Sequence, residues 1–118
     1  MDGEIEPDRL EDELDGDEDP LVVDIRNPPA FRQGHIPDSV NVPLSQLTQE
    51  VDAVADADHV VTVCPHGISS VKAARLIASY EGFDGRVDSL AGGLTSWDGP
   101  VETDTEAAAA DEGPDAPF

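Results

Sequence analysis

Short apolar runs separated by turn residues recur along the chain, and each run has the length of a buried strand. The clearest is HVVTVC at residues 59–64, where four of the six residues are valine or threonine, which favour pleated sheet. The pattern predicts strands at residues 21–25, 40–42, 59–64 and 86–90, with a short edge strand around Ile5.

Between these runs the apolar residues change to spacings of three and four, which indicate helices that bury one face. A helix beginning at Pro7 would align Leu10 with Leu14, and proline suits the first turn of a helix. The pattern predicts two further helices, at residues 45–54 and from Ser69 or Ser70 to about Glu81. Short helical segments are expected at residues 30–33, ended by Gly34, and after Gly92-Gly93, on the way to Trp97.

Strands therefore alternate with helices, which predicts an α/β fold with a parallel sheet of about five strands and helices on both faces. Residues 1–100, the acidic segment 1–19 included, are expected to form one domain. Ligands of such sheets bind beyond the carboxyl ends of the strands. Cys64 stands at one of these ends, so this is where we look for chemistry.

Charge limits the classes of partner. The 118 residues carry a formal net charge of -21, and 17 of the 27 acids lie within residues 1–19 and 101–118. Nucleic acid and anionic membrane surfaces would repel such a chain. From residue 101 onward alanine, acid and proline dominate, which predicts an acidic disordered tail over residues 101–118.

The surroundings of the protein can also be inferred. One lysine against 27 acids is typical of proteins from halophilic organisms, although two solvated acidic ends on an ordinary domain would produce the same count. No apolar run is long enough to span a bilayer, and the acidic start is unlike a signal peptide. We therefore expect a cytoplasmic protein.

Cys64 is the only cysteine, so no disulfide can form within the chain. The segment CPHGISS must turn tightly from a strand into a helix, and Gly67 supplies the conformational freedom. Backbone N–H groups of so short a loop, with the positive end of the next helix, would stabilise a thiolate or a persulfide anion on Cys64. The alternative is an inert buried cysteine before an ordinary turn.

Three segments of the sequence resemble the signatures of the rhodanese superfamily, in the same order. The cysteine loop is similar to the active-site loop of short, single-domain thiosulfate sulfurtransferases. Residues 22–43, VVDIRNPPAFRQGHIPDSVNVP, resemble the first signature, and LAGGLTSW at residues 90–97 resembles the last. The resemblance implies a rhodanese-like fold over roughly residues 4–100.

It further implies a role for each matching residue. Cys64 would be the sulfur carrier, and Pro65, His66, Gly67, Ile68, Ser69 and Ser70 would cradle the sulfur with their backbone amides. Asp24 and Arg26 would support the loop, His35 and Pro37 would shape the preceding turn, and Gly92, Gly93 and Trp97 would pack near the mouth of the site. Many rhodaneses carry a loop arginine or lysine that attracts anionic donors. Here the nearest bases are Lys72 and Arg75, in the helix, and Arg26, with His66 of the loop as a further candidate.

The implied activity is transfer of a sulfane sulfur from thiosulfate, or from another persulfide source, to cyanide, a thiol or a protein acceptor. The reaction needs no organic cofactor, and three scattered histidines with one cysteine offer no zinc-like ligand spacing. A phosphatase or arsenate reductase is disfavoured, because the position six after Cys64 is Ser70 instead of an arginine. A non-catalytic binding or regulatory module, or a sulfur-relay carrier, remains as the alternative.

Overall fold

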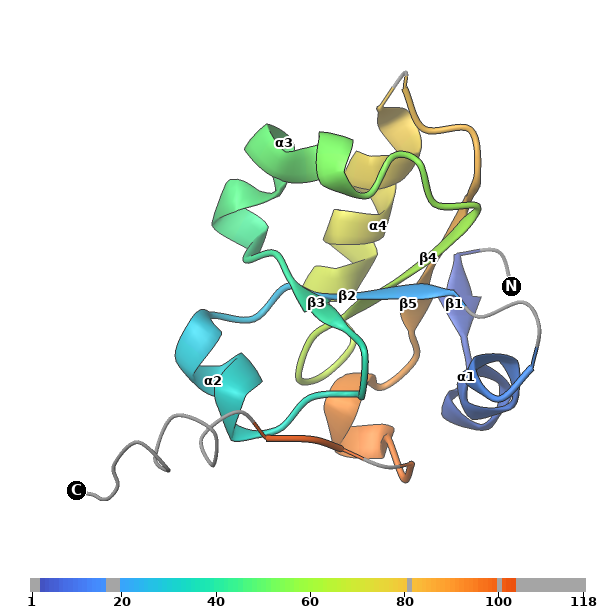
Figure 1. Cartoon of the computed structure of the whole chain (residues 1–118), viewed down its shortest axis with the longest axis vertical. Helices are drawn as coiled ribbons and strands as arrows, with labels where there is room; N and C mark the ends of the chain where they lie inside the picture. The colour runs from blue at the N-terminus through green and yellow to red at the C-terminus, as the bar shows by residue number, and fades with distance from the viewer. Residues whose placement is uncertain (1–2, 17–19, 81, 100, 104–118) are drawn as a thin grey trace.

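A computed structural model describes residues 3–16, 20–80, 82–99 and 101–103 of the chain (Figure 1). Its centre is a five-stranded sheet in which every neighbouring pair is parallel, with the strand order β1-β5-β4-β2-β3. The strands are β1 (Glu4–Ile5), β2 (Leu21–Asp24), β3 (Val40–Asn41), β4 (His59–Val63) and β5 (Arg86–Leu90). The predicted α/β fold with a parallel sheet is therefore confirmed.

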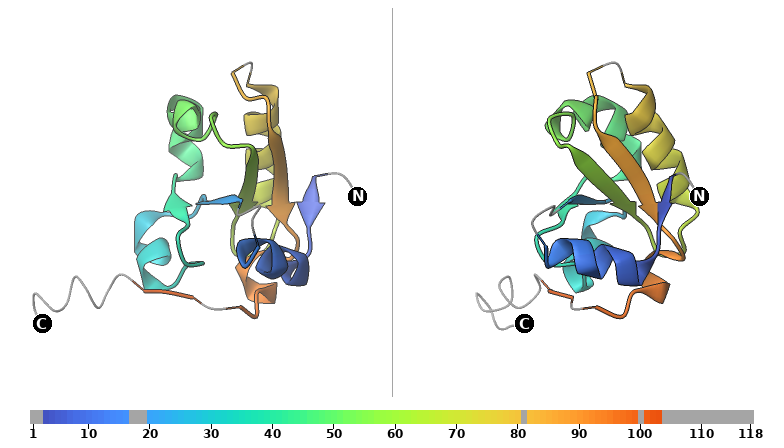
Figure 2. Two further views of the ribbon diagram at one scale, coloured as in Figure 1. Left: turned by 45° about the vertical axis from the view of Figure 1, so that its right-hand side comes forward. Right: turned by 90° about the vertical axis from the view of Figure 1, so that its right-hand side faces the viewer.

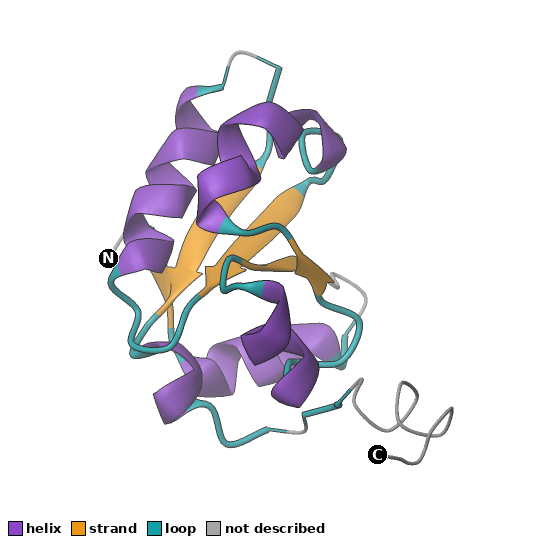
Figure 3. Ribbon diagram, turned by 90° about the vertical axis from the view of Figure 1, so that its left-hand side faces the viewer, coloured by secondary structure: helices purple, strands orange, loops and turns teal. Residues whose placement is uncertain are grey.

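Helices cover both faces of the sheet (Figures 2 and 3). One side carries α3 (Leu47–Glu50) and α4 (Ser69–Ser79), while α1 (Pro7–Leu14), α2 (Pro28–Gln33) and the 3₁₀ helix η3 (Gly93–Ser96) lie on the other. Side chains alternate between the two faces along a strand. In β4, Val60 accordingly joins the core beneath α4, whereas Val61 and Val63 join the core on the α1 side.

The helical segment predicted at residues 45–54 is present, but it is of mixed type. Only α3 is α-helical, and it is flanked by two 3₁₀ helices, η1 (Leu44–Gln46) and η2 (Val51–Ala53). Leu47, Val51 and Val54 are nevertheless buried on one side. Leu47 and Val51 are four residues apart across the α-helical turn, and Val51 and Val54 are three apart across the 3₁₀ turn, so each spacing matches the turn that it crosses. The hydrophobic spacing identified the buried positions without identifying the helix type.

Two helix ends also differ from the prediction by a few residues. The helix expected to reach about Glu81 ends at Ser79, because Tyr80 is extended with φ -76° and ψ 127°. The turn expected at residues 30–33 begins earlier, at Pro28, because proline lacks only an N–H that a first helical turn leaves unpaired. Its predicted end at Gly34 is observed, where the Gly34 N–H donates to the Phe31 carbonyl.

The end of the described chain returns to the domain at Glu102. Its N–H donates to the carbonyl of His35 at 2.7 Å, and the His35 N–H donates to the carbonyl of Glu102 at 2.9 Å. Of the segment predicted to be a disordered tail, residues 104–118 lie outside the described residues. Within the described part of the chain, no helix has the length and apolar character needed to cross a bilayer.

Candidate active site

Cys64 lies directly beyond the carboxyl end of the central strand β4. It continues the alternation of Val60 and Thr62, so its side chain points to the same side of the sheet as α4. The cysteine is 2 % exposed and belongs to the core beneath that helix. Because α4 begins only five residues later, at Ser69, the connecting loop must fold back over the sulfur.

Hydrogen-bond donors converge on the sulfur from this loop. The Gly67 N–H donates to Cys64 Sγ at 3.1 Å, and the Ser70 N–H, in the first turn of α4, donates at 3.3 Å. The Ser70 hydroxyl is also within hydrogen-bond distance of Sγ, at 3.3 Å. Such convergence is the arrangement expected of a pocket for an anion.

Two opposing effects determine the pKa of Cys64. Burial raises the pKa of the thiol, because a charge is poorly solvated away from water. Hydrogen bonds from the Ser70 hydroxyl and from the backbone N–H groups of Ser70, Gly67 and His66 lower it, and together they outweigh the burial. The net effect is a pKa below the ordinary value, which favours the nucleophilic thiolate.

A second hydroxyl lies behind Ser70. Ser89 Oγ, from β5, is 2.6 Å from Ser70 Oγ, and both serines are fully buried. Ser89 lies in none of the predicted motifs. The available signal was a hydroxyl residue in a strand beside β4, and the register pairs Ser89 with Thr62, two residues before the cysteine.

The cysteine loop and the glycine pair are packed backbone against backbone. The Leu94 and Thr95 N–H groups of η3 donate to the carbonyls of Cys64 and Pro65, at 2.9 and 3.1 Å. A Cβ on Gly93 would lie 2.3 Å from the Cys64 carbonyl oxygen, and one on Gly67 would lie 2.8 Å from the Gly92 nitrogen. These contacts account for Gly67 in the cysteine loop and for Gly93 in the glycine pair.

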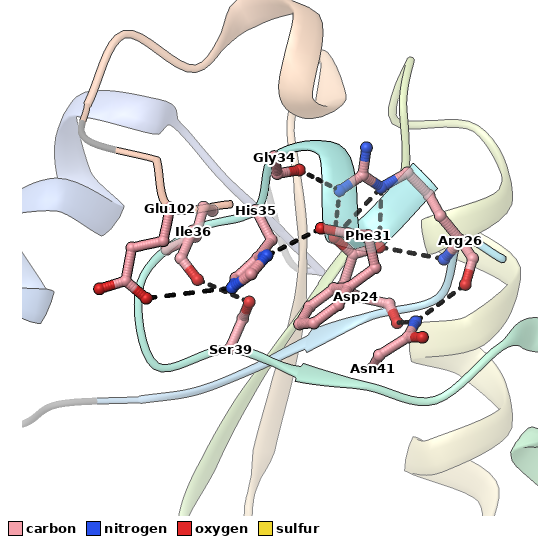
Figure 4. A network of polar contacts seen from close by, with 9 residues as sticks. All are labelled: Asp24, Arg26, Phe31, Gly34, His35, Ile36, Ser39, Asn41 and Glu102. Carbon is pink, nitrogen blue, oxygen red and sulfur yellow. Dashed lines mark hydrogen bonds and ion pairs between the residues drawn. The ribbon is translucent and has the colours of Figure 1, made fainter. Parts of the chain in front are cut away.

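At the end of β2, beside β4, the buried carboxylate of Asp24 pairs with the partly buried guanidinium of Arg26 (Figure 4). Arg26 donates to both carboxylate oxygens of Asp24, at 2.7 to 3.1 Å, and also to the Gly34 carbonyl at 2.6 Å. Asn41 donates to the carbonyls of both residues. Among the described residues, the hydrogen bonds of this pair join β2 to α2 and β3, and none reaches the loop from Cys64 to Ser70.

His35 belongs to the same region, at the end of α2 (Figure 4). Its ring stacks on Phe31 with centroids 3.9 Å apart, and Nδ1 lies 2.8 Å from the Phe31 carbonyl oxygen. Nε2 lies 3.9 Å from Glu102 Oε1. His35 therefore holds the turn after α2 and the returning chain together, which agrees with the predicted role in shaping this turn.

The remaining predicted site residues lie at the surface. Ile68 is 76 % exposed, which makes it the most exposed large apolar residue of the described chain. Lys72 and Arg75 are exposed on α4, away from its buried face. The other exposed members of the predicted loop are Pro65, His66 and Ser69. Apart from the buried sulfur and Ser70, the loop thus presents an apolar tip to solvent, and none of its residues from Pro65 to Ser70 is a lysine or arginine.

Metal ligands and cavities were the other possible features of a site among the described residues. No group of three or more histidine, cysteine or acidic residues there is arranged to hold a metal ion. A cavity of about 890 Å³ lies elsewhere, lined by carboxylates together with residues such as Leu14, His59 and Trp97. Its lining includes no residue of the cysteine loop, so this cavity is separate from the hydrogen-bonded sulfur.

Comparison with known proteins matches the profile of the rhodanese-like domain to residues 6–99 of this chain. A sulfurtransferase of Allochromatium vinosum is 34 % identical over 97 residues, which are 82 % of this chain and 89 % of that protein. The thiosulfate sulfurtransferase GlpE of Shewanella oneidensis is 42 % identical over 77 residues, or 64 % of this chain and 73 % of that protein.

A putative sulfur carrier protein of Bacillus subtilis, YrkF, is 27 % identical over 84 % of this chain, but the match spans only 52 % of YrkF. Among solved structures, a rhodanese-related protein of Thermoplasma volcanium superposes with a TM-score of 0.74 at 25 % identity. That match covers 85 % of this chain and 97 % of the other. A Bacillus halodurans protein superposes equally well, at 28 % identity, over 86 % of this chain and 77 % of its own.

Proposed function

Because this chain belongs to the rhodanese-like domain family, we propose that it is a sulfurtransferase that carries a sulfane sulfur on Cys64. The observation that carries the proposal is the convergence of the Gly67 and Ser70 N–H groups and the Ser70 hydroxyl on Cys64 Sγ. These donors lower the pKa of Cys64 despite its burial, so the residue is set up as a nucleophile.

Loading begins with attack of the Cys64 thiolate on the outer sulfur of a donor such as thiosulfate. The new Sγ–S bond forms as the donor's S–S bond breaks, and that bond's electron pair leaves with sulfite. The product is a Cys64 persulfide anion whose charge lies on the outer sulfur. The backbone N–H groups around Sγ are positioned to stabilise this anion as well.

Discharge requires a nucleophilic acceptor. Cyanide, a thiolate or a protein thiolate attacks the outer sulfur, the Sγ–S bond breaks, and its electron pair returns to Sγ. The enzyme thiolate is regenerated without oxidant, reductant or metal. Each half-reaction can proceed separately, which is the kinetic pattern of a two-step exchange through a covalent intermediate.

The charge of the loop surface affects which sulfur donor the protein would bind. No loop residue from Pro65 to Ser70 is a lysine or arginine, and the net charge of -21 repels a dianion. The proposal therefore includes donors other than thiosulfate, among them a persulfide carried by another thiol. The likeness to a putative sulfur carrier favours a relay role as the second candidate.

Intact-protein mass spectrometry tests the proposal. Wild-type protein incubated with thiosulfate should gain the mass of one sulfur, and cyanide should remove it with release of thiocyanate. Cys64→Ser, which retains a small polar side chain in the same loop, should gain nothing. If wild type gains sulfur only from a thiol persulfide, the relay role is supported; no gain from any donor would refute sulfur transfer and support a binding module.

A further inference from the structure

We propose that Ser89 is a positioning residue for Cys64 and that it acts through the hydroxyl of Ser70. This inference rests on the proposed function, since it concerns the charge that Sγ acquires during sulfur transfer. The evidence is a continuous series of contacts from β5 to the sulfur: Ser89 Oγ to Ser70 Oγ at 2.6 Å, and Ser70 Oγ to Cys64 Sγ at 3.3 Å.

The backbone of Ser70 is fixed by hydrogen bonds, which restricts the partners that its hydroxyl can reach. Its N–H donates to Sγ at 3.3 Å, and its carbonyl accepts from the Thr62 hydroxyl at 2.7 Å. Ser70 and Ser89 are both 0 % exposed, so water does not compete for their hydroxyls. Within the described residues, the hydrogen-bond partners of Ser70 Oγ are Cys64 Sγ and Ser89 Oγ.

The direction of this hydrogen-bond series follows the charge on the sulfur. When Cys64 is a thiol, its S–H can donate to Ser70 Oγ, and the Ser70 hydroxyl can donate to Ser89 Oγ. When Sγ is a thiolate it can only accept, so Ser70 must donate to it and Ser89 must donate to Ser70. A series that ends on an anion is the stronger of the two, because charge-assisted hydrogen bonds exceed neutral ones and polarise the next donor.

Because the series is stronger when Sγ is a thiolate, it should favour the step of sulfur transfer in which Sγ gains negative charge. In the persulfide, the negative charge lies on the outer sulfur and Sγ is formally neutral. When the acceptor removes the outer sulfur, Sγ departs as a thiolate and becomes the charged end of the series. Ser89 therefore favours the discharge step, since a leaving thiolate of lower pKa leaves faster.

The pKa of Cys64, measured from the pH dependence of its alkylation rate, separates this role from a structural one. Ser89→Ala should raise this pKa by about half a pH unit, a threefold loss of thiolate below the pKa, and Ser70→Ala should raise it by about one unit. Discharge of the preloaded persulfide by cyanide should slow about twofold in Ser89→Ala. Ser39→Ala, which also loses a side-chain hydroxyl bonded to protein, should change neither quantity.

The double variant is decisive, because Ser89 is proposed to act only through Ser70. In the Ser70→Ala background, Ser89→Ala should leave the pKa unchanged; a further shift equal to that in wild type would overturn the proposal. If Ser89→Ala fails to fold, the test passes to wild-type protein. In a pH titration of wild-type protein, the ¹³Cβ resonance of Ser89 should shift with the same midpoint as that of Cys64. A Ser89 resonance that does not change with pH would refute the positioning role of Ser89.

These outcomes are distinct from failure of the proposed function. Alkylation and NMR titration follow the thiol itself, whether or not any donor loads it with sulfur. A protein that never forms a persulfide but shows the predicted pKa shifts would refute sulfur transfer while retaining the Ser89 effect. Normal sulfur transfer with no shift of the Cys64 pKa in Ser89→Ala would refute the Ser89 effect and support sulfur transfer.

Discussion

Replacement of Gly93 by alanine should disturb the cysteine loop more than any other single methyl group added to the described glycines. A Cβ at this position would lie 2.3 Å from the Cys64 carbonyl oxygen and 2.5 Å from both the Gly67 nitrogen and the Pro65 oxygen. All three contacts are with backbone, which cannot rotate aside as a flexible side chain can. The loop and η3 must therefore separate.

The cost can be worked out from these contacts. Gly93 has φ +65°, a left-handed conformation that costs an L-residue about 1–2 kcal/mol. Separation of the two segments also weakens the hydrogen bonds from Leu94 and Thr95 to the loop, at about 0.5–1.5 kcal/mol each. We expect Gly93→Ala to lower the free energy of unfolding by about 2–5 kcal/mol, a large fraction of the stability of a small domain.

Urea unfolding, followed by intrinsic fluorescence of Trp97, measures this loss, and the alkylation rate of Cys64 against pH reports the state of the loop. Any folded fraction of Gly93→Ala should show a raised pKa for Cys64, because displacement of the loop weakens the N–H donors to Sγ. Gly34→Ala is the matched control. Its φ of 168° is extended backbone that alanine adopts, and an added Cβ there meets nothing within 4 Å.

The reasoning would be refuted if Gly93→Ala were as stable as Gly34→Ala and retained the wild-type pKa of Cys64. That result would mean that the loop and η3 can move apart at no cost. The backbone contacts would then have no part in holding the donors around the sulfur.

Further predictions concern the buried pair, the linkage of pH to stability, the chain end and the net charge. Arg26→Ala should cost about 3 kcal/mol in urea unfolding, because the carboxylate of Asp24, 1 % exposed, loses its charged partner and keeps the backbone N–H of residue 26 as a donor. The lowered pKa of Cys64 means that its thiolate stabilises the fold at high pH, and that this contribution is lost as the pH falls through the lowered value. The free energy of unfolding of wild type relative to Cys64→Ala should therefore grow between neutral pH and about pH 9. Deletion of residues 104–118 should leave stability and sulfur transfer unchanged, whereas deletion of 101–118 removes two backbone hydrogen bonds and should cost about 1–3 kcal/mol. Finally, the thermal midpoint should rise by several degrees between low salt and about 1 M salt, since screening relieves repulsion within a chain of net charge -21.

Each of these has an outcome that contradicts it. Arg32→Ala, which changes an exposed arginine, is the control for the buried pair, and equal losses in both variants would argue that Arg26 does not compensate a buried charge. A stability difference for Cys64→Ala that is flat with pH would contradict a lowered pKa. Equal stability of the two truncations would show that the bridge at Glu102 contributes nothing. A thermal midpoint independent of salt would exclude the halophilic interpretation of the composition.

Much of the fold was predictable because its signals are local. The run HVVTVC became β4 and the buried centre of the sheet, since strand propensity and burial there agree. Residues 45–54 were less predictable: their apolar spacing identifies a buried face, but α and 3₁₀ turns bury nearly the same positions. The loop after Cys64 was predictable from its length and its glycine, because few backbone paths join a strand to a helix so quickly.

The sequence by itself determined the order of the elements, the place of Cys64 at a strand end, and the glycines of the two motifs. Only the tertiary structure decided what these residues meet. Gly67 and Gly93 are 26 positions apart in the chain, yet a Cβ on Gly93 would lie 2.5 Å from the Gly67 nitrogen. Ser89 reaches the site because β5 pairs with β4, and Arg26 turns out to serve α2 and β3 instead of the loop. Contacts of this kind depend on which strands become neighbours and on how far their side chains extend. The pattern of residues along the chain specifies neither the order of the strands in the sheet nor the distances between their side chains.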